Sequence, residues 1–207
     1  MYDGFVRGGM TLENFLGRYD VAGAVVLLDG KRTVREEDQP LLEAIGEKLA
    51  RMSTCILFRS GNAPGADFHF SKGVIRIDPR RLEVIKPYAA HRTAAALTTR
   101  QLSLDNIDSD DEESILTLSR INKKDAGLID YDRSSKSGVL APKTRYILRD
   151  TLKVTGAGDL IKKASFALFY DDYENPESGE TGRTMMVCRK CGVPFVDQSV
   201  WMKWLGE

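Results

Sequence analysis

The fold of this chain is decided by the stretch Phe58-Arg59-Ser60-Gly61-Asn62-Ala63-Pro64-Gly65-Ala66-Asp67. The apolar residues 55–58 at its start are typical of a buried strand, and residues 66–74 can form a helix. The turn between them consists of small residues, and Gly61 and Gly65 can adopt positive φ angles. The sequence therefore predicts a strand that passes into a helix through a tight turn.

This turn has two interpretations. The free N–H groups in the first turn of a helix, reinforced by the helix dipole, are suited to bind a phosphate group, and small residues let the backbone approach a ligand closely. Gly, Asn and Pro are equally the residues of an ordinary turn between a strand and a helix. Residues 61–65 alone leave both interpretations open.

Two motifs resemble those of a known family. Residues 59–67 resemble the R-S-G-G-A-x-G-A-D signature of the SLOG superfamily, with Asn62 in place of the second Gly. Residues 179–184 (Gly-Glu-Thr-Gly-Arg-Thr) resemble a G-G-T-x-H-T loop of some members, with Glu180 for a Gly and Arg183 for a His. The superfamily comprises Rossmann-like nucleotide-binding domains, among them those of the DNA-processing protein DprA and of the LOG phosphoribohydrolases. The resemblance implies a domain of that fold.

The remaining sequence fits one α/β domain. Buried strands are predicted at residues 24–28, 55–58, 81–88, 164–170 and 193–196. Residues 93–159 change from an acidic to a basic composition and are interpreted as an insertion of helices and loops. We therefore expect residues 1–207 to form a single Rossmann-like three-layer domain, with a mostly parallel sheet and an insertion at about 93–159.

The strand, loop and helix arrangement at residues 59–67 is repeated at residues 164–184. Loops that leave the carboxyl ends of strands line the ligand crevice of an open α/β sheet, so the two helix starts can converge on one anion. Asp67 is expected to cap backbone N–H groups or to bind a ribose hydroxyl. The predicted ligand-binding residues are Gly30, Lys31, Arg32, Arg59, Ser60, Gly61, Asn62, Gly65, Asp67, Thr181, Gly182, Arg183 and Thr184.

The leading hypothesis is a protein that binds a nucleotide or a nucleotide-derived phosphate ligand. The LOG resemblance allows a second hypothesis, hydrolysis of the N-glycosidic bond of a nucleoside monophosphate. LOG enzymes carry P-G-G-x-G-T-x-x-E, and aligning Gly179 with the first Gly of that motif puts Met186 at the position of the active-site Glu. Asp171, Asp172 and Glu180 are candidate substitute carboxylates, or parts of a solvated acidic loop.

A third hypothesis is single-stranded DNA binding in the manner of DprA. The chain contains 30 Lys and Arg residues and 30 Asp and Glu residues, so no overall field attracts nucleic acid. Arg145, Arg149 and Lys153 recur on one helix face, which we expect to face solvent or, alternatively, a polyanion. Nucleic acid is therefore a possible partner but not the favoured one.

The remaining features concern location and cysteines. The longest apolar run, residues 24–28, is too short to span a membrane, and a cytoplasmic location is expected. Cys188 and Cys191 fall on an apolar helix stripe and are interpreted as structural thiols. We expect no metal and no cofactor, and the resemblance allows a homodimer.

Overall fold

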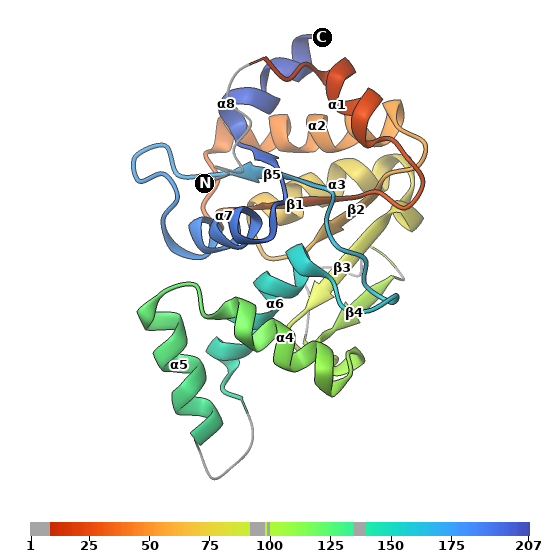
Figure 1. Cartoon of the computed structure of the whole chain (residues 1–207). Coiled ribbons are helices and arrows are strands. Elements are labelled where there is room, and N and C mark those ends of the chain that lie inside the picture. Colours follow the sequence, from red (N-terminus) through yellow and green to blue (C-terminus); the bar gives the residue numbers. More distant parts are fainter. Residues whose placement is uncertain (1–8, 92–97, 99, 135–139) are drawn as a thin grey trace.

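The computed structural model describes residues 9–91, 98, 100–134 and 140–207, and its centre is a parallel sheet (Figure 1). Within these residues the sheet has six strands in the order β4-β3-β2-β1-β5-β6, and every neighbouring pair is parallel. The strands are β1 (Val25–Gly30), β2 (Leu57–Ser60), β3 (Leu82–Lys86), β4 (Gln101–Ser103), β5 (Phe166–Tyr170) and β6 (Phe195–Val196). The predicted Rossmann-like α/β fold is confirmed.

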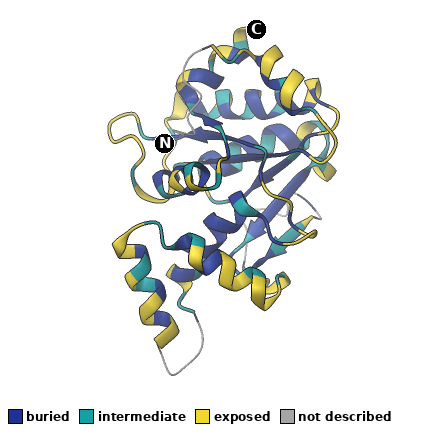
Figure 2. Cartoon of the chain, viewed as in Figure 1, coloured by how far each residue is buried: buried dark blue, intermediate teal, exposed yellow. Residues whose placement is uncertain are grey.

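Helices cover both faces of the sheet. The helices are α1 (Leu12–Tyr19), α2 (Gln39–Met52), α3 (Ala66–Ile77), α4 (Ser109–Ser119), α5 (Lys123–Ser134), α6 (Pro142–Thr155), α7 (Gly179–Cys191) and α8 (Gln198–Trp201). The first three and α8 pack on one face, and α6 and α7 pack on the other (Figure 1). Helices α4 and α5 lie outside α6, with mostly exposed outer surfaces (Figure 2).

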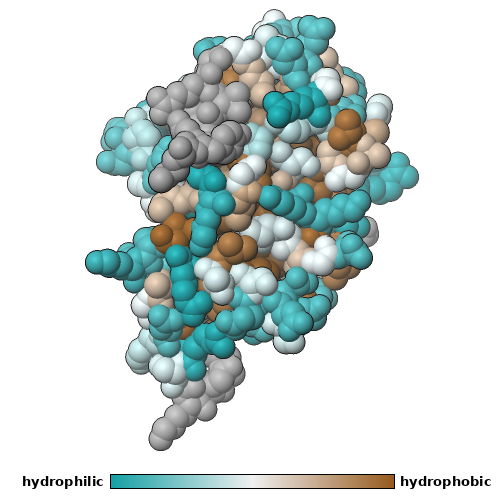
Figure 3. Space-filling view, viewed as in Figure 1, coloured by the Kyte–Doolittle hydropathy of each residue, from teal (hydrophilic) through white to brown (hydrophobic). Residues whose placement is uncertain are grey.

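The sheet is buried because its central strands have a helix layer on both sides. Val26 and Leu28 of β1 join the core under α2 and α3, while Leu27 joins the core under α6 and α7. This explains why β1 begins with an uninterrupted apolar run, as parallel strands buried on both faces usually do. Trp201 and Trp204 are fully buried in the core under α2 and α3. Hydrophilic residues predominate on the surface in Figure 3.

Part of residues 93–159 belongs to the sheet. Strand β4 pairs with β3 at the edge, and α6 packs against β3 and α7. Among the described residues of this region, α4 and α5 have the character of an added layer. The apolar content of β4 is low, which is why the sequence pattern did not predict it. Residues 93–97, 99 and 135–139 of the expected insertion lie outside the described residues.

Two glycines bring α2 and α3 into close contact. A Cβ atom on Gly73 would lie 2.0 Å from the carbonyl oxygen of Glu43, and one on Gly46 would lie 2.3 Å from that of Phe70. No side chain fits at either position, so the two helices pack backbone against backbone. This contact fixes α3, whose first turn belongs to the signature stretch.

We predict that Gly73→Ala destabilises the protein, because the added methyl group must push α2 and α3 apart. Overpacking of this kind costs about 1 to 3 kcal/mol, measurable as a lower midpoint of urea unfolding. Gly17→Ala in α1 is the matched control, since a Cβ there meets nothing within 4 Å. Equal midpoints for the two variants would contradict the close packing.

Candidate functional site

The predicted site residues gather at the carboxyl ends of β1, β2 and β5. Strand β1 lies between β2 and β5, and the chain leaves β1 toward α2 on one face and β5 toward α7 on the other. Such a reversal of strand order opens a crevice outside the strand ends, where open α/β sheets bind their ligands. The sheet topology thus places a crevice between Gly30 and Tyr170, the last residues of β1 and β5.

A cavity of about 670 Å³ occupies this crevice. It lies between the segment after β1 and the loop between β5 and α7. That loop is at the left of Figure 1. Its lining residues are Gly30, Lys31, Arg32, Thr33, Val34, Arg35, Tyr170, Asp171, Asp172, Tyr173, Glu174, Glu180 and Thr181. Charged residues that the sequence singled out therefore meet around one space, with Lys31 and Arg32 on the β1 side and Asp171, Asp172 and Glu180 on the β5 side.

The two sides of the cavity are tied together by Asp38. Its Oδ2 accepts hydrogen bonds from the hydroxyls of Tyr170 (2.7 Å) and Tyr173 (3.1 Å), and the guanidinium of Arg35 lies 4.1 Å from the centre of the Tyr173 ring. Burial and the carboxylate of Asp38 raise the pKa of Tyr173 to about 12, so its hydroxyl keeps its proton and remains a donor. Sequence inspection missed Asp38, because no spacing connects it with β5.

Positive charge in the cavity comes from the segment after β1. The Nζ of Lys31 donates to the carbonyl oxygen of Ser178 (3.0 Å) and to its hydroxyl (2.8 Å). Arg32 is largely exposed and forms one ion pair of 3.3 Å with Glu180. Lys31 also lies 3.8 Å from Asp172. Lys31, Arg32 and Arg35 line the cavity together with the carboxylates of Asp171, Asp172, Glu174 and Glu180.

The N-terminus of α7 faces the same cavity. The first intrahelical bond of α7 is donated by Gly182 to the carbonyl of Ser178, and the side chain of Ser178 does not cap the helix. The N–H groups of the first turn, including that of Thr181, therefore have no intrahelical partner. Gly179 adopts a φ of +66°, which lets the chain turn directly into the helix. Aligned free N–H groups beside Lys31 make an environment that favours an anion.

The carboxylates of the loop after β5 differ in environment. Asp171 is buried, its Oδ2 accepts the N–H of Glu177, and its Oδ1 has no hydrogen-bond partner among the described residues. Burial raises the pKa of Asp171. Asp172 is partly exposed, and N–H groups of Asn175 and Glu174 lower its pKa. Asp171 is thus the carboxyl group of this cavity that lacks a full set of partners.

The loop at residues 59–67 uses its own amide groups internally. The carboxylate of Asp67 accepts the N–H of Gly61 (3.1 Å) and the N–H of Gly30 (3.1 Å), and the Asn62 N–H donates to the hydroxyl of Ser60 (3.0 Å). Asp67 therefore does not cap the N-terminus of α3. Its carboxyl group accepts donors of both loops, where a bound anion was expected.

Gly65 joins the loops that follow β1 and β2. It adopts a φ of +96°, and a Cβ at this position would lie 2.2 Å from the carbonyl oxygen of Arg32. The next residue, Ala66, donates its N–H to the carbonyl of Lys31. Gly65 thus allows close contact between two backbone segments.

Arg59 does not line the crevice. Its side chain is fully buried under the sheet face that α6 covers, where Nε donates to Glu83 (2.7 Å) and Nη1 to the carbonyl of Lys153 (2.9 Å). The sequence placed Arg59 with the loop cations, but it lies within β2, and its side chain contacts β3 and α6.

A buried charge network lies beneath the two loops. Lys153 contacts Asp29 (3.0 Å) and Asp150 (3.2 Å), and Arg149 contacts Asp150 (2.7 Å). These side chains are nearly inaccessible. The expectation that Arg149 and Lys153 face solvent is wrong, because carboxylates of the sheet and of α6 itself satisfy them inside the protein. Of the three residues of the stripe, Arg145 alone lies partly at the surface, paired with Asp105.

The second motif is also largely engaged. Arg183 donates to Asp125 (3.0 Å) of α5 and lies 3.6 Å from Asp150, and Thr184 donates its hydroxyl to the carbonyl of Glu180. A Cβ on Gly182 would overlap the backbone of Glu177. Gly182, Arg183 and Thr184 therefore hold the start of α7 in place rather than lining the large cavity.

The two motifs do converge, but on a space of only about 10 Å³. Asp67, Arg149, Asp150, Thr181 and Thr184 are among the residues that line it. This is too small for a phosphate group, so the space available to a ligand is the neighbouring cavity at β1 and β5.

The described part of the chain contains no group of three or more His, Cys, Asp or Glu side chains arranged to hold a metal ion. No helix in that part is both long and apolar enough to cross a membrane. Cys188 is buried in α7, which raises the pKa of its thiol, and Cys191 is half-buried, in line with the predicted structural role.

A solved structure shares this fold. It is that of DNA processing protein A from Helicobacter pylori, with a TM-score of 0.52 and 11% sequence identity over 85% of this chain. The match spans 65% of that protein's chain, and that structure is described as giving insight into its single-stranded DNA binding mode. No protein-family model and no curated protein matches the sequence. The DprA likeness therefore holds for the fold, and membership of the SLOG superfamily stays a prediction.

We predict a pH dependence that originates at Asp67. Burial, and then the neighbouring Asp29, raise the pKa of Asp67 to about 8 from an ordinary value of 3.8. Between about pH 4 and pH 8 the folded protein thus holds a proton that the unfolded chain has already released. The contribution to stability is complete below about pH 4 and is lost as the pH rises through 8, by up to about 1.4 kcal/mol per pH unit.

Asp67→Asn removes this titration, so its unfolding free energy should fall less between about pH 5 and pH 8 than that of the parent. Asp78→Asn is the control, because hydrogen bonds with Arg80 lower the pKa of Asp78 and keep it ionised throughout this range. Urea unfolding at several pH values measures the slopes. Identical slopes for Asp67→Asn and the parent would contradict the assignment.

Proposed function

We propose that the protein binds a nucleotide or a nucleotide-derived phosphate ligand in the cavity between β1 and β5. The observation that carries this proposal is the uncapped N-terminus of α7 beside Lys31 and Arg32 at the edge of that cavity. Free N–H groups, a helix dipole and two cations all favour a phosphate at this position. The Rossmann-like topology supports the same location.

The size and composition of the cavity support a ligand larger than phosphate alone. Its volume of about 670 Å³ falls within the range of about 300 to 1,000 Å³ of small-molecule sites. Charge-assisted hydrogen bonds contribute about 1.5 to 3 kcal/mol each, so two of them give only millimolar binding. The stacked Arg35 and Tyr173 offer a flat surface for a base, and Asp171 offers an acceptor for a hydroxyl.

Single-stranded DNA binding is the second candidate, favoured by the fold likeness to DNA processing protein A. Two observations weigh against it. The net charge is zero, and Arg149 and Lys153 of the expected basic stripe are buried in ion pairs. Binding of a polyanion needs exposed cations, and its affinity falls steeply with salt.

Hydrolysis of an N-glycosidic bond would need a carboxyl group at the cavity, and Asp171 supplies one with an unused oxygen.

One experiment separates these candidates. The protein is incubated with nucleoside mono-, di- and triphosphates, cyclic nucleotides, ADP-ribose and oligo-dT, while melting temperature and release of free base are followed together. A ligand at about ten times its Kd adds about 1.4 kcal/mol, which raises the melting temperature of a domain of this size by about 3 to 6 °C. Stabilisation without base release supports the proposed binder, and base release indicates a hydrolase.

We predict that Arg32→Ala weakens the response to the stabilising nucleotide by about 10-fold or more, because one charge-assisted contact is removed. Arg51→Ala is the matched control, since Arg51 is also an exposed arginine paired with a glutamate, Glu47, but lies on α2. An equal response in both variants would remove the cavity from consideration. A salt-dependent response to oligo-dT alone would favour DNA binding instead.

A further inference from the structure

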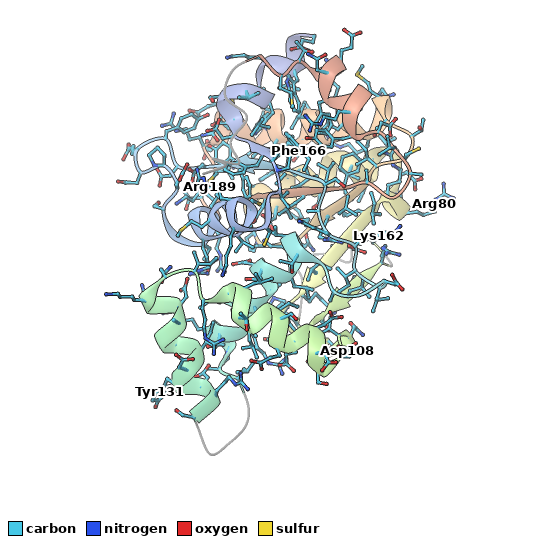
Figure 4. All side chains as sticks on the ribbon, viewed as in Figure 1. Arg80, Asp108, Tyr131, Lys162, Phe166 and Arg189 are labelled. Atoms are coloured by element: carbon cyan, nitrogen blue, oxygen red, sulfur yellow. The ribbon has the colours of Figure 1, made fainter. Side chains whose placement is uncertain are left out.

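A second polar pocket lies at the opposite, amino-terminal end of the strands. Its volume is about 210 Å³, and it opens where β1, β2 and β3 begin. The residues that line it are Gly23, Ala24, Val25, Cys55, Leu57, Arg59, Arg80, Glu83, Arg100 and Lys162. In Figure 4, Arg80 and Lys162 lie on the right, on the side away from the α7 loop that borders the proposed nucleotide site.

Arg59, one of the residues that line this pocket, has an unused donor. Its Nε and Nη1 are bonded to Glu83 and to the carbonyl of Lys153, but Nη2 is buried and has no hydrogen-bond partner among the described residues. A buried charged donor without an acceptor destabilises the folded protein, because its lost hydration is not replaced. Burial is also the main cause that lowers the pKa of Arg59, with the nearby cation Arg100 acting in the same direction. Nη2 of Arg59 therefore lacks an acceptor within the described residues.

The surrounding charges leave the pocket positive. Glu83, the acidic residue of the lining, is shared, with Oε1 bonded to Arg59 and Oε2 bonded to Arg100 (2.7 Å). The side chain of Arg80 is 86% exposed and pairs with Asp78 beside the pocket. Lys162 is exposed, and no ion pair or hydrogen bond of its side chain occurs within the described residues. Two arginines share one carboxylate here, and a free lysine stands at the entrance.

We propose that this pocket binds a small oxyanion, a phosphate group in particular, between Nη2 of Arg59 and the ammonium group of Lys162. The acceptor oxygens of such a group meet the donor that the protein leaves unpaired, and its negative charge balances the excess of cations. At about 210 Å³ the pocket is smaller than the roughly 300 Å³ at which small-molecule sites begin, so it takes the phosphate group and not a whole nucleotide. The site is independent of the proposed nucleotide cavity.

The test uses the full chain with inorganic phosphate, glycerol phosphate and, at matched ionic strength, chloride. We expect both phosphates to raise the melting temperature more than chloride does. Cys55 provides a local readout, because it lines the pocket and is exposed. Phosphate should slow alkylation of Cys55 by iodoacetamide, quantified by peptide mass spectrometry. A response to inorganic phosphate alone would identify a free ion as the occupant, and a response to both would identify a phosphate group that can be carried on a larger molecule.

Variants locate the effect. Arg59 is too deeply buried to replace safely, so Lys162→Ala is the informative change, and we predict a half-saturating phosphate concentration about 10-fold higher. Lys163→Ala is the matched control, because the neighbouring Lys163 reaches the carbonyl of Cys191 instead of the pocket. The inference is overturned if chloride acts like phosphate or if Lys162→Ala binds like the parent. It is also overturned if Arg32→Ala, and not Lys162→Ala, abolishes the phosphate response, since the ion would then occupy the nucleotide cavity.

Discussion

The carboxyl group of Asp67 determines the shape of the candidate site. It accepts N–H groups from Gly30 and Gly61, the residues at which the chain leaves β1 and β2, and so holds the two loops in one arrangement. The buried cations Arg149 and Lys153 act on it from α6. Because of these hydrogen bonds, the amide groups of the first motif are bonded within the protein and are not offered to a ligand. The open space lies one strand further along, between β1 and β5, where the first turn of α7 carries no side-chain cap.

The sequence predicted the fold well, because its main signals are local. Uninterrupted apolar runs marked β1, β2 and β5, and the turn at residues 59–67 marked the passage from strand to helix. Strand β4 was missed because it is short and only partly buried at the sheet edge. The two motifs were expected to meet at one edge of the sheet, since parallel strands and their following loops share that edge. They do meet, but the larger space lies between the ends of β1 and β5.

The chemistry inside the site could not be predicted in the same way. Lys153 pairs with Asp29 of β1, and no sequence spacing connects two residues so far apart in the chain. A basic helix stripe is usually solvated, and only the tertiary structure shows that this one neutralises buried carboxylates. Arg59 illustrates the same limit. It is the first residue of the motif but belongs to β2, so the direction of its side chain follows the alternation of the strand.

The Asp38 contacts have a consequence for the energetics of recognition. Because one carboxylate binds the hydroxyls of both Tyr170 and Tyr173, the walls of the β1 and β5 cavity are held at a fixed separation before anything enters. A ligand bound there as proposed would meet preorganised walls, and little of its interaction energy would be spent on ordering them. Such a site would select ligands by how well their shape fits the fixed walls.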